Sequence, residues 1–158
     1  MTENHELNLK VLVATPADVN DLFAFEKLCF EHAPDQFPKR NLRHLITSPT
    51  SRTMIIRDEQ GVIFATVTGL LRHFKVPSGR IYKIGVLPGL KKRGIGSFLI
   101  RTVEDWFRSQ GMQRSCAEVR ESNSPSRHMF EKNGYVETGM LYWFYAGGEN
   151  AVKYWKTL

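Results

Sequence analysis

The amino-acid sequence predicts an α/β protein with a mixed sheet. Two pairs of strand-like segments with turn residues between them, 53–56 with 62–74 and 140–145 with 151–156, are typical of antiparallel hairpins. Between these hairpins, a helical period that begins at Ile95 lies between two further strand-like segments. A strand, a helix and a strand in this order form a parallel crossover. The predicted sheet therefore has antiparallel hairpins on both sides of one crossover.

The first part of the chain predicts one strand and then two helices. Leu7, Leu9, Val11 and Val13 recur at every second position, which is the period of a strand. Residues 15–18 form a capping box with proline at the first helical position, and they open a helix whose apolar positions extend to Phe30. Residues 31–43 contain two prolines and predict an irregular connection, which leads into a short helix over 42–46.

The middle of the chain predicts three strands and a long helix. The turn at 58–61 joins the two strands of the first hairpin, and Ser78 with Gly79 predicts a second turn. The strand 81–86 follows and is stopped by Pro88. Apolar residues then recur at the helical period over 95–107, which predicts the helix of the crossover.

The last part of the chain predicts a strand, a short helix and the final hairpin. Gly111 suits the C-terminus of the long helix, and 115–120 is strand-like. Residues 125–133 predict a short helix that ends at Gly134. The final hairpin turns at the glycine pair 147–148.

Length and composition predict a single domain over residues 1–158. The chain has 42% apolar and 24% charged residues, close to the averages of globular domains, which argues against a disordered or membrane protein. No apolar run reaches the length of a spanning helix, and the N-terminal segment is polar and acidic, unlike a signal peptide. We therefore expect a cytoplasmic protein that does not bind membranes.

The cysteines and histidines give no indication of a metal site. Cys29 and Cys116 lack the spacing of metal ligands or of a redox motif, so we expect two reduced, buried thiols. The five histidines likewise show none of the pairings that bind zinc. The sequence predicts no metal.

A formal net charge of +6 suggests an anionic partner. Nucleic acid is one candidate and a small polyanion is another. The basic residues fall in separate groups without an aromatic-rich RNA-binding motif or a zinc finger, which disfavours nucleic acid. These groups are Lys39 with Arg40 and Arg43, Arg72 with Lys75, the run 91–93, and the arginines between Arg114 and Arg127.

The run VLPGLKKRGIGS, residues 86–97, occupies the turn between a predicted strand and the predicted long helix. The first amides of a helix lack intrahelical partners, and the helix dipole favours an anion there. Glycines at 94 and 96 would let a phosphate approach the backbone, although a basic, solvated turn explains the same letters. A Walker A loop is excluded because Ile95 stands at the lysine position, and a dinucleotide fingerprint because Leu99 stands at the third glycine.

Two stretches in sequence order resemble the GNAT superfamily of acyl-CoA-dependent N-acyltransferases. The first is IGVLPGLKKRGIGSFLI. The family signature reads Q/R-x-x-G-x-G/A, where x is any residue. Gly94 and Gly96 match its two small positions, and Lys91 stands where the family has Gln or Arg. The second, AEVRESNSPSRHMFEKNGYVETG, matches the next strand and the Asn-initiated helix of that family. Within the family, EVRESN is most similar to enzymes that acetylate protein N-termini, including ribosomal-protein alanine acetyltransferases.

The resemblance implies the GNAT fold, in which a mostly antiparallel sheet is splayed around the coenzyme and flanked by about four helices. It also implies acetyl-CoA as cosubstrate: a backbone cradle for its pyrophosphate, strand groups that pair with its pantetheine arm, and an amide near Val86 that polarises the thioester carbonyl. The coenzyme-binding residues that it implies are Ile84, Gly85, Val86, Lys91, Lys92, Arg93, Gly94, Ile95, Gly96, Ser97, Asn123 and Phe130. Asn123 is equally compatible with an ordinary helix cap.

The resemblance also implies a general base and a general acid. Glu118 matches the glutamate that N-terminal acetyltransferases use as base, directly or through water, with Glu121 in reserve; a solvent-facing glutamate paired with Arg120 or Arg72 explains Glu118 as well. The family often has a tyrosine acid where this chain has Phe130. Tyr142, our candidate acid, or Tyr145 would then protonate the thiolate; otherwise water does so, or catalysis is poor.

The function that follows is acetyl transfer from acetyl-CoA to a primary amine by direct attack in a ternary complex. The acceptor is a small molecule or a peptide, its site is lined by residues 31–43 and 146–150, and the protein is a monomer or a homodimer. Two alternatives remain. One is a regulatory protein that binds acyl-CoA with weak or no catalysis, as Phe130 suggests, and the other is a basic nucleic-acid-binding domain.

Overall fold

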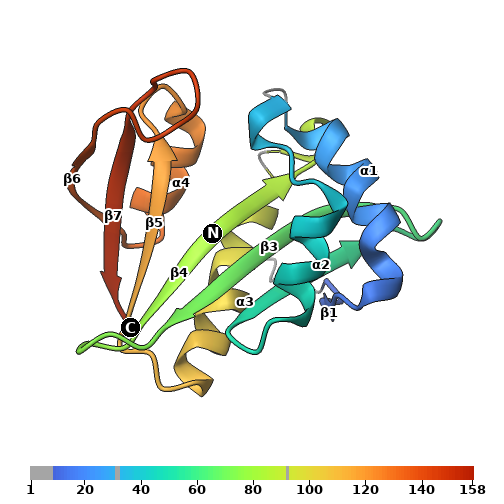
Figure 1. Ribbon diagram of the computed structural model, residues 1–158, viewed down its shortest axis with the longest axis horizontal. Coiled ribbons are helices and arrows are strands. Elements are labelled where there is room, and N and C mark those ends of the chain that lie inside the picture. Colours follow the sequence, from blue (N-terminus) through green and yellow to red (C-terminus); the bar gives the residue numbers. More distant parts are fainter. Residues whose placement is uncertain (1–8, 31–32, 92) are drawn as a thin grey trace, which may run out of the picture.

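The protein forms a mixed seven-stranded sheet with two helices on each face (Figure 1). The computed structural model describes residues 9–30, 33–91 and 93–158. Helices α1 (Val19–Cys29) and α2 (Lys39–Thr47) cover one face, and α3 (Ile95–Ser109) and α4 (Ser124–Lys132) the other. Every helix in these described ranges is too short or too polar to cross a lipid bilayer.

The strand order is β1-β2-β3-β4-β5-β7-β6. The bounds are Leu12–Val13, Ser51–Arg57, Ile63–Arg72, Ser78–Val86, Arg114–Arg120, Val136–Leu141 and Ala151–Thr157 for β1 to β7. Strands β4 and β5, joined through α3, are the one parallel pair among the described strands, and the other neighbours are antiparallel. The predicted element order and the mixed sheet are therefore confirmed.

Two hydrophobic clusters follow the two faces of the sheet. The larger one packs Leu99, Val103 and Phe107 of α3 against strand side chains such as Val67 and Ala117. The smaller one packs α1 and α2 against the opposite face of β2 and β3. Neighbouring residues of β2 alternate between the clusters, as the period of a strand requires.

The helix starts and ends agree with the local signals. Thr15 and Asp18 form the predicted capping box, with the short 3-10 helix η1 (Pro16–Asp18) leading into α1. Gly111 and Gly134 have positive φ just beyond α3 and α4, as expected of glycines at helix C-termini. Residues 33–35 form a second 3-10 turn, η2 (Ala33–Asp35), and α2 begins three residues before the predicted helix.

One expected turn and one expected strand, the strand over 140–145, are corrected by the structure. Ser78 and Gly79 lie in β4, and the turn occupies the residues before them. A Cβ on Gly79 would lie 2.3 Å from the Phe107 ring, so this glycine admits α3 rather than forming a turn. Strand β6 begins at Val136, and residues 142–145 belong to the connection. The first residues of the predicted strand over 7–13 lie outside the described residues.

Candidate active site

A gap opens between β4 and β5. The two strands pair only over Ser78–Ile81 with Arg114–Ala117. Beyond that point β4 continues to Val86 paired with β3 alone, and β5 continues to Arg120 paired with β7 alone. The two strands diverge toward the open end of the sheet in Figure 1. One edge of each strand is left without a β partner there, so an extended ligand could add to it.

A β-bulge at Tyr82 decides which backbone groups face the gap, because the N–H and C=O groups of the residues after it point alternately to β3 and to the gap. The register between β3 and β4 shifts by one residue at this point. The Leu87 N–H donates to the Phe64 carbonyl of the β3 side at 2.9 Å. Alternation therefore directs the N–H and C=O of Gly85 to β3 and those of Ile84 and Val86 to the gap.

The structure corrects the expected role of Gly85. Its backbone groups belong to the ladder with β3, so they do not face the gap. A Cβ at this position would lie 2.8 Å from Cys29 Sγ and 2.9 Å from the Phe30 ring. Gly85 therefore allows α1 to pack closely on β4. Cys29 itself is half-buried, and burial raises its thiol pKa to about 11, so it stays protonated.

The N-terminus of α3 lies directly after β4 and has no side-chain cap. Gly94, at the N-cap, has φ 78°, a conformation that suits glycine. The first α-helical bond runs from the Phe98 N–H to the Gly94 carbonyl, so the amides of residues 95–97 lack intrahelical partners. The first turn contains no acidic residue. This end of α3 can therefore accept an anion.

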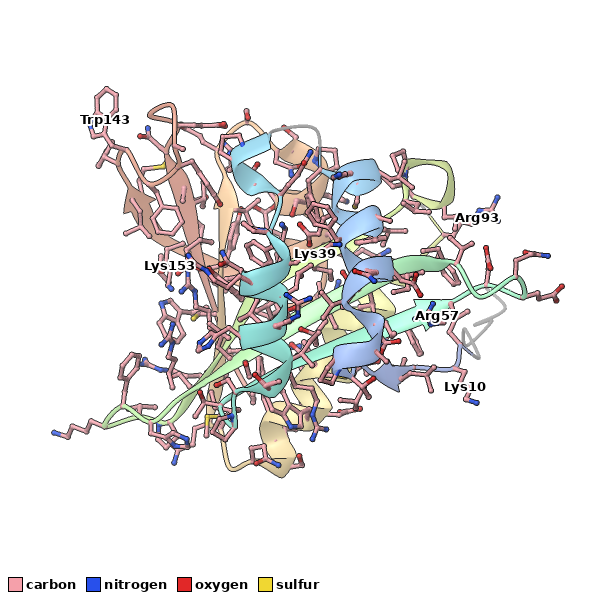
Figure 2. All side chains as sticks on the ribbon, turned by 45° about the vertical axis from the view of Figure 1, so that its right-hand side comes forward. Lys10, Lys39, Arg57, Arg93, Trp143 and Lys153 are labelled. Carbon is pink, nitrogen blue, oxygen red and sulfur yellow. The ribbon has the colours of Figure 1, made fainter. Side chains whose placement is uncertain are left out.

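The side chains around this helix end have separate roles. Lys91 and Arg93 are exposed, and Arg93 projects into solvent in Figure 2, whereas Lys92 lies outside the described residues. Ile95 is buried in the larger cluster. The Ser97 hydroxyl accepts a hydrogen bond from the Asn133 side chain at 2.9 Å.

Gly96 has a packing role that the sequence did not indicate. A Cβ there would lie 2.4 Å from Met129 Sδ, so the glycine lets α4 approach α3. Its missing side chain therefore makes room for a neighbouring helix. The expectation that it keeps space for a phosphate is not needed to explain it.

Asn123 and Phe130 are both placed by α4. Asn123 is the N-cap, and its Oδ1 accepts from the Ser126 N–H at 3.2 Å, which confirms the helix-cap interpretation. Phe130 was expected to bind the coenzyme, but this residue is only 2% exposed. It packs edge-on against Tyr135 at 5.1 Å and stacks on Tyr154 at 6.2 Å between centroids. Phe130 is therefore a core residue in this structure, because aromatic partners enclose it.

Glu118 is held by two cations. Its Oε2 accepts from Arg80 Nε at 2.9 Å and its Oε1 from Lys153 Nζ at 2.6 Å. The side chain is 9% exposed, so it is not the solvent-facing glutamate, paired with Arg120 or Arg72, that the sequence also allowed. Glu121, the reserve base, is exposed and accepts from Asn150 at 3.1 Å.

The connection between β6 and β7 brings Tyr145, rather than Tyr142, to Glu118. The Tyr142 side chain is 72% exposed. The Tyr145 hydroxyl donates to the Glu118 carbonyl at 3.4 Å, and burial raises its pKa to about 12. Trp143, at the tip of the connection, is 79% exposed and has φ 59°, which is unusual for a bulky residue.

Arg120 joins the two segments that were expected to line the acceptor site. It donates to Asp35 Oδ1 at 2.6 Å and to Glu149 Oε2 at 2.8 Å, which links η2 on one side of the gap to the β6–β7 connection on the other. Hydrogen bonds from Ser122 and Arg120 lower the pKa of Glu149 to about 2. The Asp35 main-chain carbonyl also accepts from Lys83.

Lys83 and Glu26 form a second ion pair beside the gap. Lys83 Nζ lies 2.5 Å from Glu26 Oε2 and under the rings of Phe30 and Phe37, at 3.9 and 3.8 Å. Burial raises the pKa of Glu26 and lowers that of Lys83. Sequence reasoning missed Lys83 and Asp35, together with Arg80 and Lys153. They come from β4, η2 and β7, and no spacing in the sequence relates them.

Comparison with known proteins places this geometry in a family. A model of the Acetyltransferase (GNAT) family matches residues 19–135. An N-alpha-acetyltransferase of Sulfurisphaera tokodaii is 32% identical over 77 residues, which are 48% of this chain and 46% of that protein. A mycothiol acetyltransferase of Beutenbergia cavernae is 30% identical over 91 residues, which are 56% of this chain and 29% of that protein. The matched regions thus span less than half of these two relatives.

The fold has a similar counterpart among solved structures. The crystal structure of Ard1 from Thermoplasma volcanium superposes with a TM-score of 0.81 at 20% identity, covering 94% of this chain and 97% of that one. At this level of identity the likeness concerns the fold.

Proposed function

Because the chain belongs to the acetyltransferase (GNAT) family, we propose that it transfers an acetyl group from acetyl-CoA to a primary amine by direct attack in a ternary complex. The observation that carries the proposal is the loss of β4–β5 pairing beyond Ile81 and Ala117, directly beside the uncapped N-terminus of α3. A strand edge without a β partner and an anion-binding helix end, next to each other, fit an extended molecule that carries phosphates. The names of the sequence relatives support acetyl transfer.

The residues of this chain fit coenzyme A. The amides of residues 95–97 would hold the pyrophosphate, with Lys91 and Arg93 adding positive charge, and the gap-facing groups of Ile84 and Val86 would pair with the pantetheine arm. When bound, acetyl-CoA supplies an activated thioester. The Val86 N–H faces the gap, where it would donate to the carbonyl oxygen as negative charge develops on it.

The acceptor amine must be neutral before it attacks, since an ammonium has no lone pair. An α-amino group has an ordinary pKa near 8, so deprotonation is easy at neutral pH. Glu118 is our candidate base, and both of its oxygens accept from cations. We propose that it takes the proton through a water molecule, while Arg80 and Lys153 disfavour a bound ammonium.

The departing thiolate takes a proton from Tyr145 in this proposal. Its hydroxyl lies at Glu118, and with a pKa of about 12 it is protonated throughout the physiological range. Tyr142 shares the same connection but is exposed, and Phe130 has no proton to give. A coenzyme thiol, with an ordinary pKa near 8.5, leaves fairly readily in any case.

The proposed function is tested by release of free thiol from acetyl-CoA in the presence of peptides with free N-termini. We expect turnover that depends on both substrates. Acetyl-CoA at a hundred times its dissociation constant should also stabilise the fold by about 2.7 kcal/mol, which a thermal melt detects. Stabilisation without turnover on any amine would favour the regulatory alternative. If acetyl-CoA leaves the melting temperature unchanged and the protein binds nucleic acid with an affinity that falls steeply with salt, the nucleic-acid-binding alternative is favoured.

A further inference from the structure

A pocket of about 410 Å³ lies between α2 and the bulge of β4. Its walls are aromatic: Phe37 and Tyr82 stack with ring centroids 5.5 Å apart. The other lining residues are Leu45, Arg40, Asn41 and His44. An apolar hollow with a few polar groups on one side is the usual form of a site for a small group.

This pocket shares a wall with the candidate active site. The Arg80 guanidinium lies 5.1 Å from the centre of the Tyr82 ring, and the same Arg80 binds Glu118. Phe37, which stacks on Tyr82, also contacts Lys83 beside the gap. A group that extends from an amine bound at Glu118 would therefore meet Tyr82 and then the pocket.

The charges around the site differ from one end to the other. At Glu118, two cations share one carboxylate, which leaves a net charge of +1. At Arg120, two carboxylates share one cation, which leaves −1. Lys83 and Glu26 cancel. Arg40 adds a further positive charge in the pocket, and it forms no ion pair with any residue that the structure describes.

We propose that the acceptor is an amine that also carries a carboxylate, and that Arg40 binds this carboxylate in the pocket. This inference rests on the proposed acetyl transfer and narrows its substrate class. The ammonium form of the acceptor is attracted to the Asp35–Arg120–Glu149 end, and the neutral amine reacts at Glu118. Its carboxylate extends past Tyr82 to the second end, at Arg40. Polyamines carry only positive charge and meet like charge at that second end. The carboxylate belongs either to a free amino acid or to an acidic side chain of a peptide.

The test compares acceptors that differ in a single charge. Thiol release from acetyl-CoA is measured with two peptide amides of identical sequence except for glutamate or glutamine at the second position, with free glutamate, and with spermidine. We expect kcat/KM to be about tenfold higher for the glutamate peptide than for the glutamine peptide, the effect of one charge-assisted hydrogen bond. Spermidine is the poorest acceptor. A higher rate with free glutamate than with the peptide assigns the site to an amino acid.

Variants at position 40 test whether Arg40 causes the preference for the glutamate peptide. Arg40→Gln should abolish the preference for the glutamate peptide, and Arg40→Glu should reverse the preference. Arg43→Gln is the matched control, because Arg43 is exposed on the same helix but does not line the pocket. The preference should also weaken as salt increases, because Arg40 is exposed.

Two outcomes overturn the inference. One is equal kcat/KM for the two peptides in the parent protein, and the other is a preference that survives in Arg40→Gln. Both leave the proposed function standing, because acetyl transfer still occurs. If no amine supports release of thiol from acetyl-CoA, the proposed function fails, and the inference fails with it.

Discussion

At the residue scale, the two cations on Glu118 constrain how this carboxylate can act. Arg80 and Lys153 each donate to one oxygen, and each oxygen keeps a second lone pair that can take a proton, directly or through water. The same cations make a nearby ammonium less favourable, which helps the acceptor to bind in its neutral, reactive form.

If Glu118 is the base, Glu118→Gln should lower turnover about 10² to 10⁴ fold near neutral pH, and the rate should recover at higher pH as free amine accumulates. Coenzyme-induced stabilisation should remain. An unchanged rate in Glu118→Gln, with a large loss in Glu121→Gln, would assign the base to Glu121.

The two tyrosines of the β6–β7 connection, Tyr142 and Tyr145, can be compared to identify the proton donor. Tyr145→Phe should slow single-turnover acetyl transfer, by at most about 10² to 10⁴ fold, because its hydroxyl is the one at Glu118. Tyr142→Phe should have little effect, since that side chain is 72% exposed. If only the Tyr142 variant slows transfer, Tyr142 is the acid, as the sequence predicts. If neither does, proton donation does not limit the reaction.

The sequence located several of these residues but not their surroundings. Asn123 and Glu118 stand in a continuous motif, so their strand and helix positions could be read directly. The partners of Glu118 come from β4 and β7, which lie 38 residues before it and 35 residues after it. The burial of Phe130 depends on Tyr135, which follows α4 closely, and on Tyr154, whose contact with it arises only when β7 and α4 pack together.

At the element scale, close contacts between helices and strands explain glycines that the sequence assigned to turns or ligands. Gly79 admits Phe107 of α3, Gly85 admits Cys29 and Phe30, and Gly96 admits Met129. Sequence patterns report a missing side chain but not the neighbour that needs the space. The hairpin error at the end of the chain has a related cause. Asn150 and Glu149 fold residues 142–150 back on themselves, which ends pairing at Leu141.

Gly79→Ala should destabilise the fold by about 1 to 3 kcal/mol or more, because the new Cβ would meet a buried aromatic ring at 2.3 Å. Urea denaturation measures this change. Gly89→Ala is the control, since a Cβ there would meet nothing within 4 Å. Equal midpoints for the two variants would mean that α3 is free to move away from β4, against the close packing described here.

At the scale of the whole molecule, the two parts of the sheet meet at both ends of the gap. At the closed end, β4 and β5 pair over four residues, and at the open end Arg120 connects Asp35 to Glu149. The fold class and the order of the elements could be predicted because they depend on local periodicity. The charged bridge could not, because it joins residues 85 and 29 positions apart that have no common motif.

This bridge should make stability depend on pH in the acid range. The pKa of Glu149 is lowered to about 2 from an ordinary value of 4.5. Its contribution is therefore fully present above pH 4.5 and is lost as the pH falls toward 2. The difference in unfolding midpoint between the parent protein and Glu149→Gln should shrink over that interval. A difference that stays constant would mean that Glu149 is not paired in the folded state.

The β4 edge at the gap has a consequence for how fast main-chain hydrogens exchange with solvent. The amide hydrogens of Ile84 and Val86 point away from β3 and have no strand partner, whereas those of Gly85 and Leu87 lie in the ladder. In heavy water the first pair should therefore exchange much faster than the second, with an alternation that follows the strand. Coenzyme that pairs with this edge would slow only the fast members. The alternating pattern would then give way to uniform protection, as in the interior of a continuous sheet.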